Sequence, residues 1–100
     1  MSLKSMIAAH PHVDGHVNDP LEAAIEAARD CAVICAACAD ACIGESNPGE
    51  MAQCIRTDLD CADICAATAT VALRRTGSNE GVIRAMLETC AAACAAGAAE

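Results

Sequence analysis

The chain beyond residue 18 is organised into helical segments separated by short polar linkers, and none of it shows the alternation of a half-buried strand. The segment Asp19-Pro20-Leu21-Glu22 is a helix start signal, because Asp can cap free backbone N–H groups and Pro suits the first helical position. Asn47-Pro48-Gly49-Glu50 repeats this signal, and Ser78 can cap a further helix. The pattern predicts three helices, over about residues 20–43, 48–75 and 79–97.

Two glycines mark the ends of the first two predicted helices. Gly44 follows the first and Gly77 follows the second, where glycine commonly ends a helix. The linkers are short, so consecutive helices should lie antiparallel. The predicted fold class is therefore all-α, an antiparallel helical bundle with three long helices visible in this chain.

The first 18 residues differ from the rest of the chain. Residues 1–18 show no helical periodicity and carry all three histidines, His10, His12 and His16, together with a proline and a glycine. We predict an extended or loosely ordered N-terminal arm here. The Cys-lined helical bundle is predicted over residues 19–100.

The composition supports helix and indicates a core that lacks ordinary hydrophobic bulk. The chain has 100 residues, enough for one domain, and 55% of them are hydrophobic, yet none is Phe, Tyr or Trp. The apolar content is mainly Ala, the best helix former, with nine Cys. An Ala-rich core buries little area per residue. We therefore expect the fold to depend on long regular helices, oligomer contacts or bound metal.

The net charge of −8, with six Lys and Arg in all, argues against partners that bind a basic surface. Nucleic acids and anionic membranes both require such a surface. No apolar run approaches the length of a transmembrane span. Residues 1–9 contain too few apolar and basic residues for a secretory signal. We predict a cytoplasmic protein with no nucleic-acid or membrane partner. Its thiols should stay reduced, so the nine cysteines are candidate ligands or reactive groups before they are candidate disulfides.

The cysteines lie on one face of each predicted helix. At about 100° per residue, the four in the first helix fall within a stripe about 60° wide, and those of the other two helices fall within about 40°. Inward-facing stripes would line a tube with thiols. One or two cysteines are usually small buried hydrophobes, but nine aligned thiols favour metal ligation. The candidate ligands are Cys31, Cys35, Cys38, Cys42, Cys54, Cys61, Cys65, Cys90 and Cys94.

The spacing favours Cu(I) over other metals. Two sulfurs on one metal stand about 4–5 Å apart, given bonds of about 2.3 Å, and cysteines four residues apart on a helix suit this separation. Soft thiolates select Cu(I), which often takes two of them. Zinc is less favoured, because a tetrahedral site would need two helices and the paired CxxC motifs are absent. An iron–sulfur cluster is disfavoured, since Cys35-Ala-Ala-Cys38 lacks the further cysteines and proline of a ferredoxin motif.

The repeated CxxxCxxCxxxC spacing, with the segments from Cys54 to Cys65 and from Cys90 to Cys94, resembles the Cys-rich four-helix-bundle copper-binding family. That family includes the bacterial copper storage proteins, and some members are mislabelled ferredoxin. The resemblance covers roughly residues 20–100 and implies a bundle of four-helix type filled with Cu(I)–thiolate sites, with all nine cysteines as ligands and frequent homo-oligomers. Gly97 stands where the spacing would place a further cysteine, and a fourth helix is either missing here or supplied by another subunit.

Other side chains are weaker candidates. Asp58 lies on the thiol face, but a hard carboxylate is a poor Cu(I) ligand. Thr68 shares that face and can bond a carbonyl one turn back. Met51 and Met86 lie near the Cys stripes, where Met is more often core filler. The three histidines would be accessory ligands in a metal-acceptance site at the mouth of the tube, although a solvated arm is the simpler interpretation.

The predicted function is copper storage, buffering or detoxification by sequestration of several Cu(I) ions. No set of base, nucleophile and orienting group is visible, so we predict no enzyme activity. A copper chaperone or a small thiol would be the partner in copper transfer. The leading alternative is a thiol redox or electrophile sensor that forms reversible disulfides, and a purely structural helix module is a third possibility. Nine aligned thiols are more than a sensor needs.

Overall fold

The computed structural model describes residues 1–98, and within that range the regular structure is helical throughout. Helix α1 spans Leu3–Ala8 and α2 spans Asp19–Ile43. A 3₁₀ helix, η1 (Pro48–Met51), leads into α3 (Ala52–Ala72), and α4 spans Glu80–Ala98. The predicted all-α fold with three long helices is confirmed.

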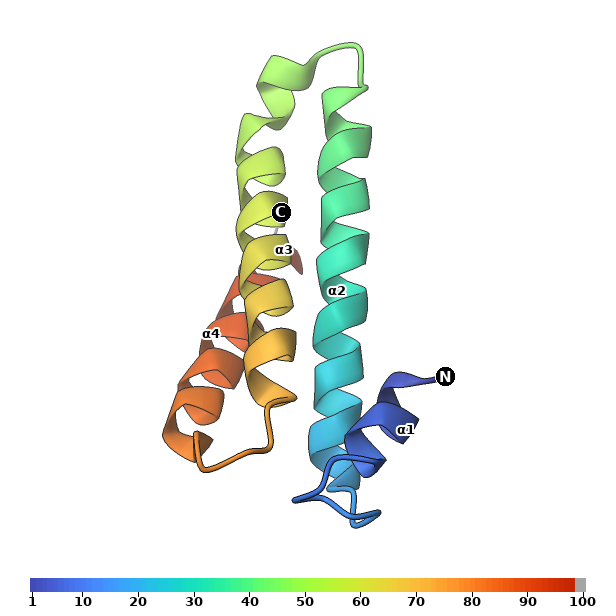
Figure 1. The fold of residues 1–100 in the computed structure, drawn as a ribbon. Coiled ribbons are helices and arrows are strands. Elements are labelled where there is room, and N and C mark those ends of the chain that lie inside the picture. Colours follow the sequence, from blue (N-terminus) through green and yellow to red (C-terminus); the bar gives the residue numbers. More distant parts are fainter. Residues whose placement is uncertain (99–100) are drawn as a thin grey trace.

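The three long helices form an elongated antiparallel bundle (Figure 1). α2 and α3 run side by side in opposite directions, and α4 turns back from the end of α3 and runs along it at an incline. The short α1 lies beside the beginning of α2. The molecule measures 52 × 29 × 16 Å along its principal axes. Its smallest dimension is little more than the diameter of one helix, about 10–12 Å, so deep burial occurs only where helices face one another.

Helix α2 begins one residue earlier than predicted. Asn18 caps it, because its Oδ1 accepts a hydrogen bond from the Leu21 N–H at 3.1 Å. Asp19, the predicted cap, is the first helical residue. Glu22, expected in a capping box, is buried instead at 7% exposure. Burial, together with the neighbouring carboxylate of Glu26, raises the pKa of Glu22.

Helix α3 starts with a 3₁₀ turn and ends earlier than predicted. Asn47, the predicted cap, makes no capping bond and donates to the side-chain carboxylate three residues on. The helix ends at Ala72 rather than near residue 75, and the chain turns through Gly77, whose φ of 72° favours glycine. Asn79 Nδ2 donates to the Val71 carbonyl at 3.1 Å, which ties the start of α4 to the end of α3.

The N-terminal segment contains a helix where the sequence predicts an extended or loosely ordered arm. A capping box of two serines holds α1: the Ser5 N–H donates to Ser2 Oγ at 3.1 Å, and the Ser2 N–H donates to Ser5 Oγ at 3.0 Å. Ile7 of this helix is 8% exposed and packs into the core. A helix of 6 residues is too short for a periodic pattern, and its box uses Ser in place of Glu or Gln.

The core changes composition along the bundle. Near the start of α2 it is apolar, with Ile7, Ile25 and Ile83 packed together. Farther along it consists of thiols, and Cys61 and Cys65 are 1% and 0% exposed. Alanines fill the remaining core positions. Such small side chains allow the helices to approach closely, which brings the thiols of different helices within contact distance.

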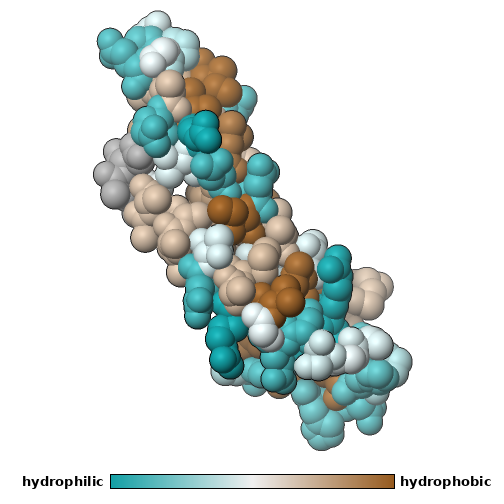
Figure 2. All heavy atoms as spheres, turned by 90° about the vertical axis from the view of Figure 1, so that its left-hand side faces the viewer, coloured by the Kyte–Doolittle hydropathy of each residue, from teal (hydrophilic) through white to brown (hydrophobic). Residues whose placement is uncertain are grey.

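The surface exposes hydrophobic side chains as well as acidic ones. Val33, Ile34 and Val82 are 67%, 66% and 55% exposed. On the side formed by α3 and α4, hydrophobic side chains lie in patches between hydrophilic ones (Figure 2). Within residues 1–98, no helix combines the length and the apolar character needed to cross a membrane.

Replacing Ile83 by Ala should lower the free energy of unfolding by about 2–5 kcal/mol, because this side chain is 7% exposed and its removal leaves a cavity. Val82→Ala on the same helix is the matched control, since Val82 is 55% exposed and should change that free energy by about 0.5 kcal/mol or less. Urea denaturation of the reduced protein, followed by circular dichroism, measures both. Equal effects of the two substitutions would contradict this packing.

Candidate metal centre

None of the nine cysteines, all of which lie within residues 1–98, forms a disulfide, and six of them gather between the long helices. α2 carries four cysteines, α3 three and α4 two. In the central group, called here the inner thiol cluster, each Sγ lies 3.8 Å or less from another Sγ. The inner thiol cluster consists of Cys31, Cys35, Cys61, Cys65, Cys90 and Cys94.

The shortest contacts in the inner thiol cluster join different helices. Cys94 Sγ on α4 lies 3.3 Å from both Cys31 Sγ on α2 and Cys61 Sγ on α3. Cys31 Sγ and Cys61 Sγ are 3.7 Å apart, and Cys65 Sγ lies 2.8 Å from Cys90 Sγ. Within α3, Cys61 Sγ and Cys65 Sγ are 3.8 Å apart. Sulfurs from three helices therefore lie in contact with one another, so a single ion can bind sulfurs from more than one helix.

A second group of potential ligands, called here the outer group, consists of Cys38, Cys42 and Asp58. Its ligand atoms lie within 4.8 Å of one another, and Cys38 is exposed. Asp58 hydrogen-bonds with Cys38, and this bond and the carboxylate charge raise the pKa of that thiol to about 11. The outer group thus combines soft sulfur with a hard carboxylate. Cys54, on α3, is half-buried.

Burial keeps three thiols of the inner thiol cluster protonated. It is the main cause that raises the pKa of Cys65 and Cys61 far above the usual thiol range, and hydrogen bonds with Cys90 and Cys94 add to it. Burial also raises the pKa of Cys35. These three thiols are neutral at pH 7, which avoids the repulsion that neighbouring thiolates would suffer. A metal ion must displace their protons in order to bind.

A groove between α2 and α4 reaches the inner thiol cluster from the surface. It has a volume of about 320 Å³, and Cys31, Cys90 and Cys94 line it together with alanines and Leu87. Sequence analysis did not single out Leu87 or the alanines, because they carry no ligating atom. Only the relative placement of α2 and α4 makes them walls of a path to the thiols.

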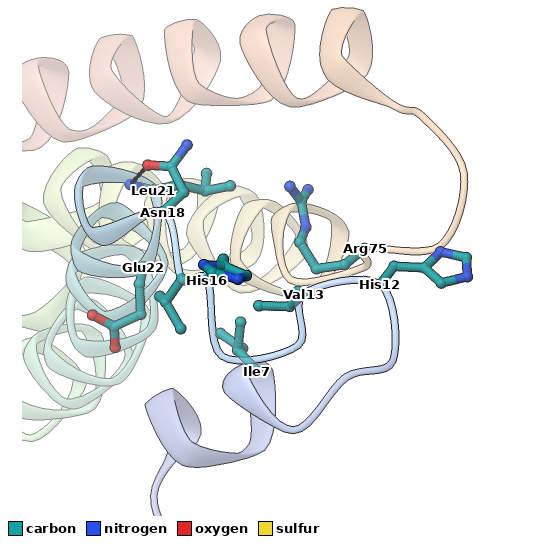
Figure 3. Close-up of a pocket in the computed structure, with 9 residues that line it drawn as sticks. Ile7, His12, Val13, His16, Asn18, Leu21, Glu22 and Arg75 are labelled. Atoms are coloured by element: carbon teal, nitrogen blue, oxygen red, sulfur yellow. Dashed lines mark hydrogen bonds between the residues drawn. The ribbon is translucent and has the colours of Figure 1, made fainter.

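The three histidines lie near the end of α3 and the start of α2, at the apolar end of the core. His10 Nε2 is 3.0 Å from Thr76 Oγ1. His12 and His16 line a cavity of about 220 Å³ beside Arg75, and the His12 ring points away from the other labelled side chains (Figure 3). Among residues 1–98, no histidine joins a group of three or more potential ligands. The structure thus does not bring the histidines together with the thiols.

The remaining candidates are two methionines and one threonine. Met51 ends η1 and is half-buried, and Met86 is half-buried on α4. The Thr68 hydroxyl donates to the Ile64 carbonyl at 2.7 Å, which is the predicted bond one turn back, and lies 3.4 Å from the Met86 carbonyl. Thr68 is 1% exposed, and its hydroxyl contacts backbone carbonyls of both α3 and α4.

Comparison with known proteins places this arrangement among copper-binding helical proteins. A family model described as copper storage protein, Csp, matches residues 17–100. The chain is similar to the copper storage protein Ccsp from Streptomyces lividans loaded with 10 copper equivalents, with 42% identity, a TM-score of 0.88, and coverage of 96% of this chain and 74% of that chain. Double and single histidine-to-alanine mutants of Streptomyces lividans Ccsp match with 47% identity and a TM-score of 0.77, over 81% of this chain and 68% of theirs. No curated protein matches the sequence.

Raising the pH should destabilise the reduced, metal-free protein. The pKa values of Cys35, Cys61 and Cys65 are higher in the folded state, so the unfolded chain loses protons first as the pH passes the ordinary thiol pKa of about 8.5. The stability from these neutral thiols should be complete below that pH. This stability should then decline as the pH rises. Cys38, whose pKa is about 11, should add to the decline near that pH, and the decline should continue above it.

Anaerobic urea denaturation from about pH 7 to 11 measures this decline. The chain has a single lysine and no tyrosine, so groups other than thiols contribute little to the slope at alkaline pH. The double substitution Cys61→Ala and Cys65→Ala should flatten the slope. An unchanged slope in that variant would contradict burial of these thiols as the cause.

Proposed function

The chain belongs to the copper storage protein family, and from this premise we propose that it stores copper as several Cu(I) ions held by cysteine thiolates inside the helical bundle. Storage, buffering and detoxification all rest on sequestration, and we propose no catalytic reaction. The proposed ligands are Cys31, Cys35, Cys38, Cys42, Cys54, Cys61, Cys65, Cys90 and Cys94.

The observation that carries this proposal is the inner thiol cluster. Its sulfurs come from α2, α3 and α4, and the Sγ–Sγ contacts between them run from 2.8 to 3.8 Å. Soft thiolates select Cu(I) over harder cations. The sulfurs of one helix touch those of the next, so one thiolate can bridge two ions. The cluster therefore supports shared ligation in addition to the separate pairs expected within each helix.

Charge supports bridged Cu(I) as the cargo of a buried cluster. Four of the nine thiols are half-buried or exposed in the groove or the outer group, whereas Cys61 and Cys65 are fully buried. A buried excess of thiolate charge is costly unless it is compensated. Equal numbers of Cu(I) ions and bridging thiolates form a neutral assembly. Each thiol that becomes a ligand releases its proton to water as the ion binds.

We propose that copper is exchanged with a copper chaperone or a small thiol in the cytoplasm. Ligand exchange requires that a donor reach at least one thiol before the ion passes inward. Cys38 is exposed in the outer group, and Cys31, Cys90 and Cys94 line the groove between α2 and α4. Family membership favours this storage role over the alternative of a redox or electrophile sensor.

Anaerobic titration of the reduced protein with Cu(I), in competition with a Cu(I)-selective chelator, should give uptake of several ions per chain. Absorption from thiolate-to-copper charge transfer reports binding, and the absence of Trp and Tyr leaves the ultraviolet region clear. Replacing the four cysteines of α2 by Ala should reduce the uptake greatly, because these side chains supply two sulfurs of the inner thiol cluster and both sulfurs of the outer group. The four positions are Cys31, Cys35, Cys38 and Cys42.

The matched control replaces His10, His12 and His16 by Ala, which should leave the Cu(I) stoichiometry unchanged because these side chains join no ligand group among residues 1–98. Uptake of one ion or none by the unmodified protein at competitive affinity would contradict a storage role. Loss of uptake in the histidine variant comparable to that in the α2 variant would contradict the ligand assignment.

We also propose that the chain assembles into a homo-oligomer. Val33 and Ile34 on α2 are 67% and 66% exposed, and burial of these apolar side chains against a second copy of the chain would remove them from water. Light scattering coupled to size-exclusion chromatography should give a mass that is a multiple of 10.1 kDa. Val33→Asp with Ile34→Asp should shift the mass toward the monomer, because it places charge on the proposed contact. A monomeric mass for the unmodified protein at micromolar concentration would contradict the assembly.

A further inference from the structure

Four sulfurs of the inner thiol cluster are mutually close, and we call this subset the four-sulfur site. All four sulfur atoms lie within 4.8 Å of one another. One comes from α2, two from α3 and one from α4. The four-sulfur site consists of Cys31, Cys61, Cys65 and Cys94.

The edges of this sulfur group match those of a metal-centred tetrahedron. A tetrahedral ion with metal–sulfur bonds of about 2.3 Å separates its sulfurs by about 3.8 Å. In the four-sulfur site the edges between Cys61, Cys65 and Cys94 measure 3.8, 3.6 and 3.3 Å. The edges from Cys31 to Cys61 and to Cys94 measure 3.7 and 3.3 Å. Five of the six edges therefore lie within about half an ångström of the ideal value.

Two-coordinate Cu(I) fits these four atoms less directly. An ion on a line between two sulfurs holds them about 4–5 Å apart, which is longer than all five of these contacts. Tetrahedral coordination by four thiolates is instead typical of zinc and of the ions that replace it. From the sequence, zinc is less favoured than copper in part because a tetrahedral site would need two helices. In the folded chain, three helices contribute sulfurs to one site.

We propose that the four-sulfur site takes one divalent ion of the zinc class in tetrahedral coordination when Cu(I) is absent. The ion would join α2, α3 and α4 at their common contact. Binding converts the four thiols to thiolates, with release of four protons to water and formation of four metal–sulfur bonds. The product carries a charge of −2 in a chain whose net charge is already −8. This charge opposes binding in a chain that is already acidic, and the four metal–sulfur bonds must offset it.

Cobalt(II) is the probe, because four-coordinate cobalt has intense visible d–d bands and thiolate-to-cobalt charge-transfer bands, whereas six-coordinate cobalt is nearly colourless. Titration of the full, reduced chain under anaerobic conditions should give the tetrahedral spectrum with an endpoint of one Co²⁺ per chain. An equivalent of Zn²⁺ should then bleach it. A weak six-coordinate spectrum would overturn the proposal.

Substitutions identify which sulfurs bind the probe. Cys61→Ser and, separately, Cys94→Ser should lower the cobalt affinity by about tenfold or more and change the charge-transfer bands, because each removes one thiolate. Cys94 is half-buried, so this variant keeps the test valid if replacement of the buried Cys61 prevents folding, as circular dichroism would report. Cys42→Ser is the matched control, since it lies in the outer group and should leave the spectrum and endpoint unchanged.

The outcome is separable from that of the copper proposal. Loss of the cobalt spectrum in Cys42→Ser, with retention in Cys61→Ser and Cys94→Ser, would place the divalent ion in the outer group and overturn the inference. Normal Cu(I) uptake without tetrahedral cobalt binding would overturn only the inference. Tetrahedral cobalt binding at one ion per chain with uptake of one Cu(I) or none would support the four-sulfur site and reject copper storage.

Discussion

The burial of neutral thiols between α2, α3 and α4 is the constraint on which the rest of the molecule depends. The same atoms serve as core and as ligands, because Cys61 and Cys65 are almost wholly buried while their sulfurs touch those of neighbouring helices. A thiol is a small hydrophobic group when protonated and a metal ligand when ionised. Burial favours the protonated form, so the empty bundle can pack, and proton loss is coupled to the arrival of a metal ion.

This dual use explains the composition. Alanine and cysteine fill the space between the helices, and the absence of aromatic residues allows the backbones to approach until sulfurs from three helices are within 3.8 Å. A core of this kind gains little from hydrophobic burial. The isoleucines Ile7, Ile25 and Ile83 supply the ordinary apolar packing at one end, and α1 completes it by adding Ile7. The N-terminal segment is thus part of the core and not an appendage to it.

The two ends of the bundle differ in chemistry. The apolar end carries the histidines, whose contacts are with Thr76 and the cavity beside Arg75 rather than with thiols. The opposite end carries Asp58 beside an exposed cysteine, and the groove between α2 and α4 opens along the side. Metal chemistry is consequently concentrated from the middle of the bundle toward the outer group. The inner sulfurs suit soft ions and ions that prefer tetrahedral coordination, and the outer group adds a harder carboxylate ligand.

The sequence by itself determined the all-α class, the three long helices and the alignment of the cysteines on one face of each, because helical periodicity and strong start and stop signals are local properties. It did not reveal α1, which is too short to show a period, or the choice of Asn18 over Asp19 as the cap of α2. Nor does the sequence show which cysteines of one helix contact those of another. Which cysteine of α4 meets which cysteine of α2 and α3 depends on the rotation and inclination of whole helices. Those are set by packing among residues far apart in the chain, so only the tertiary structure placed Cys94 against Cys31 and Cys61 and left the histidines at the other end.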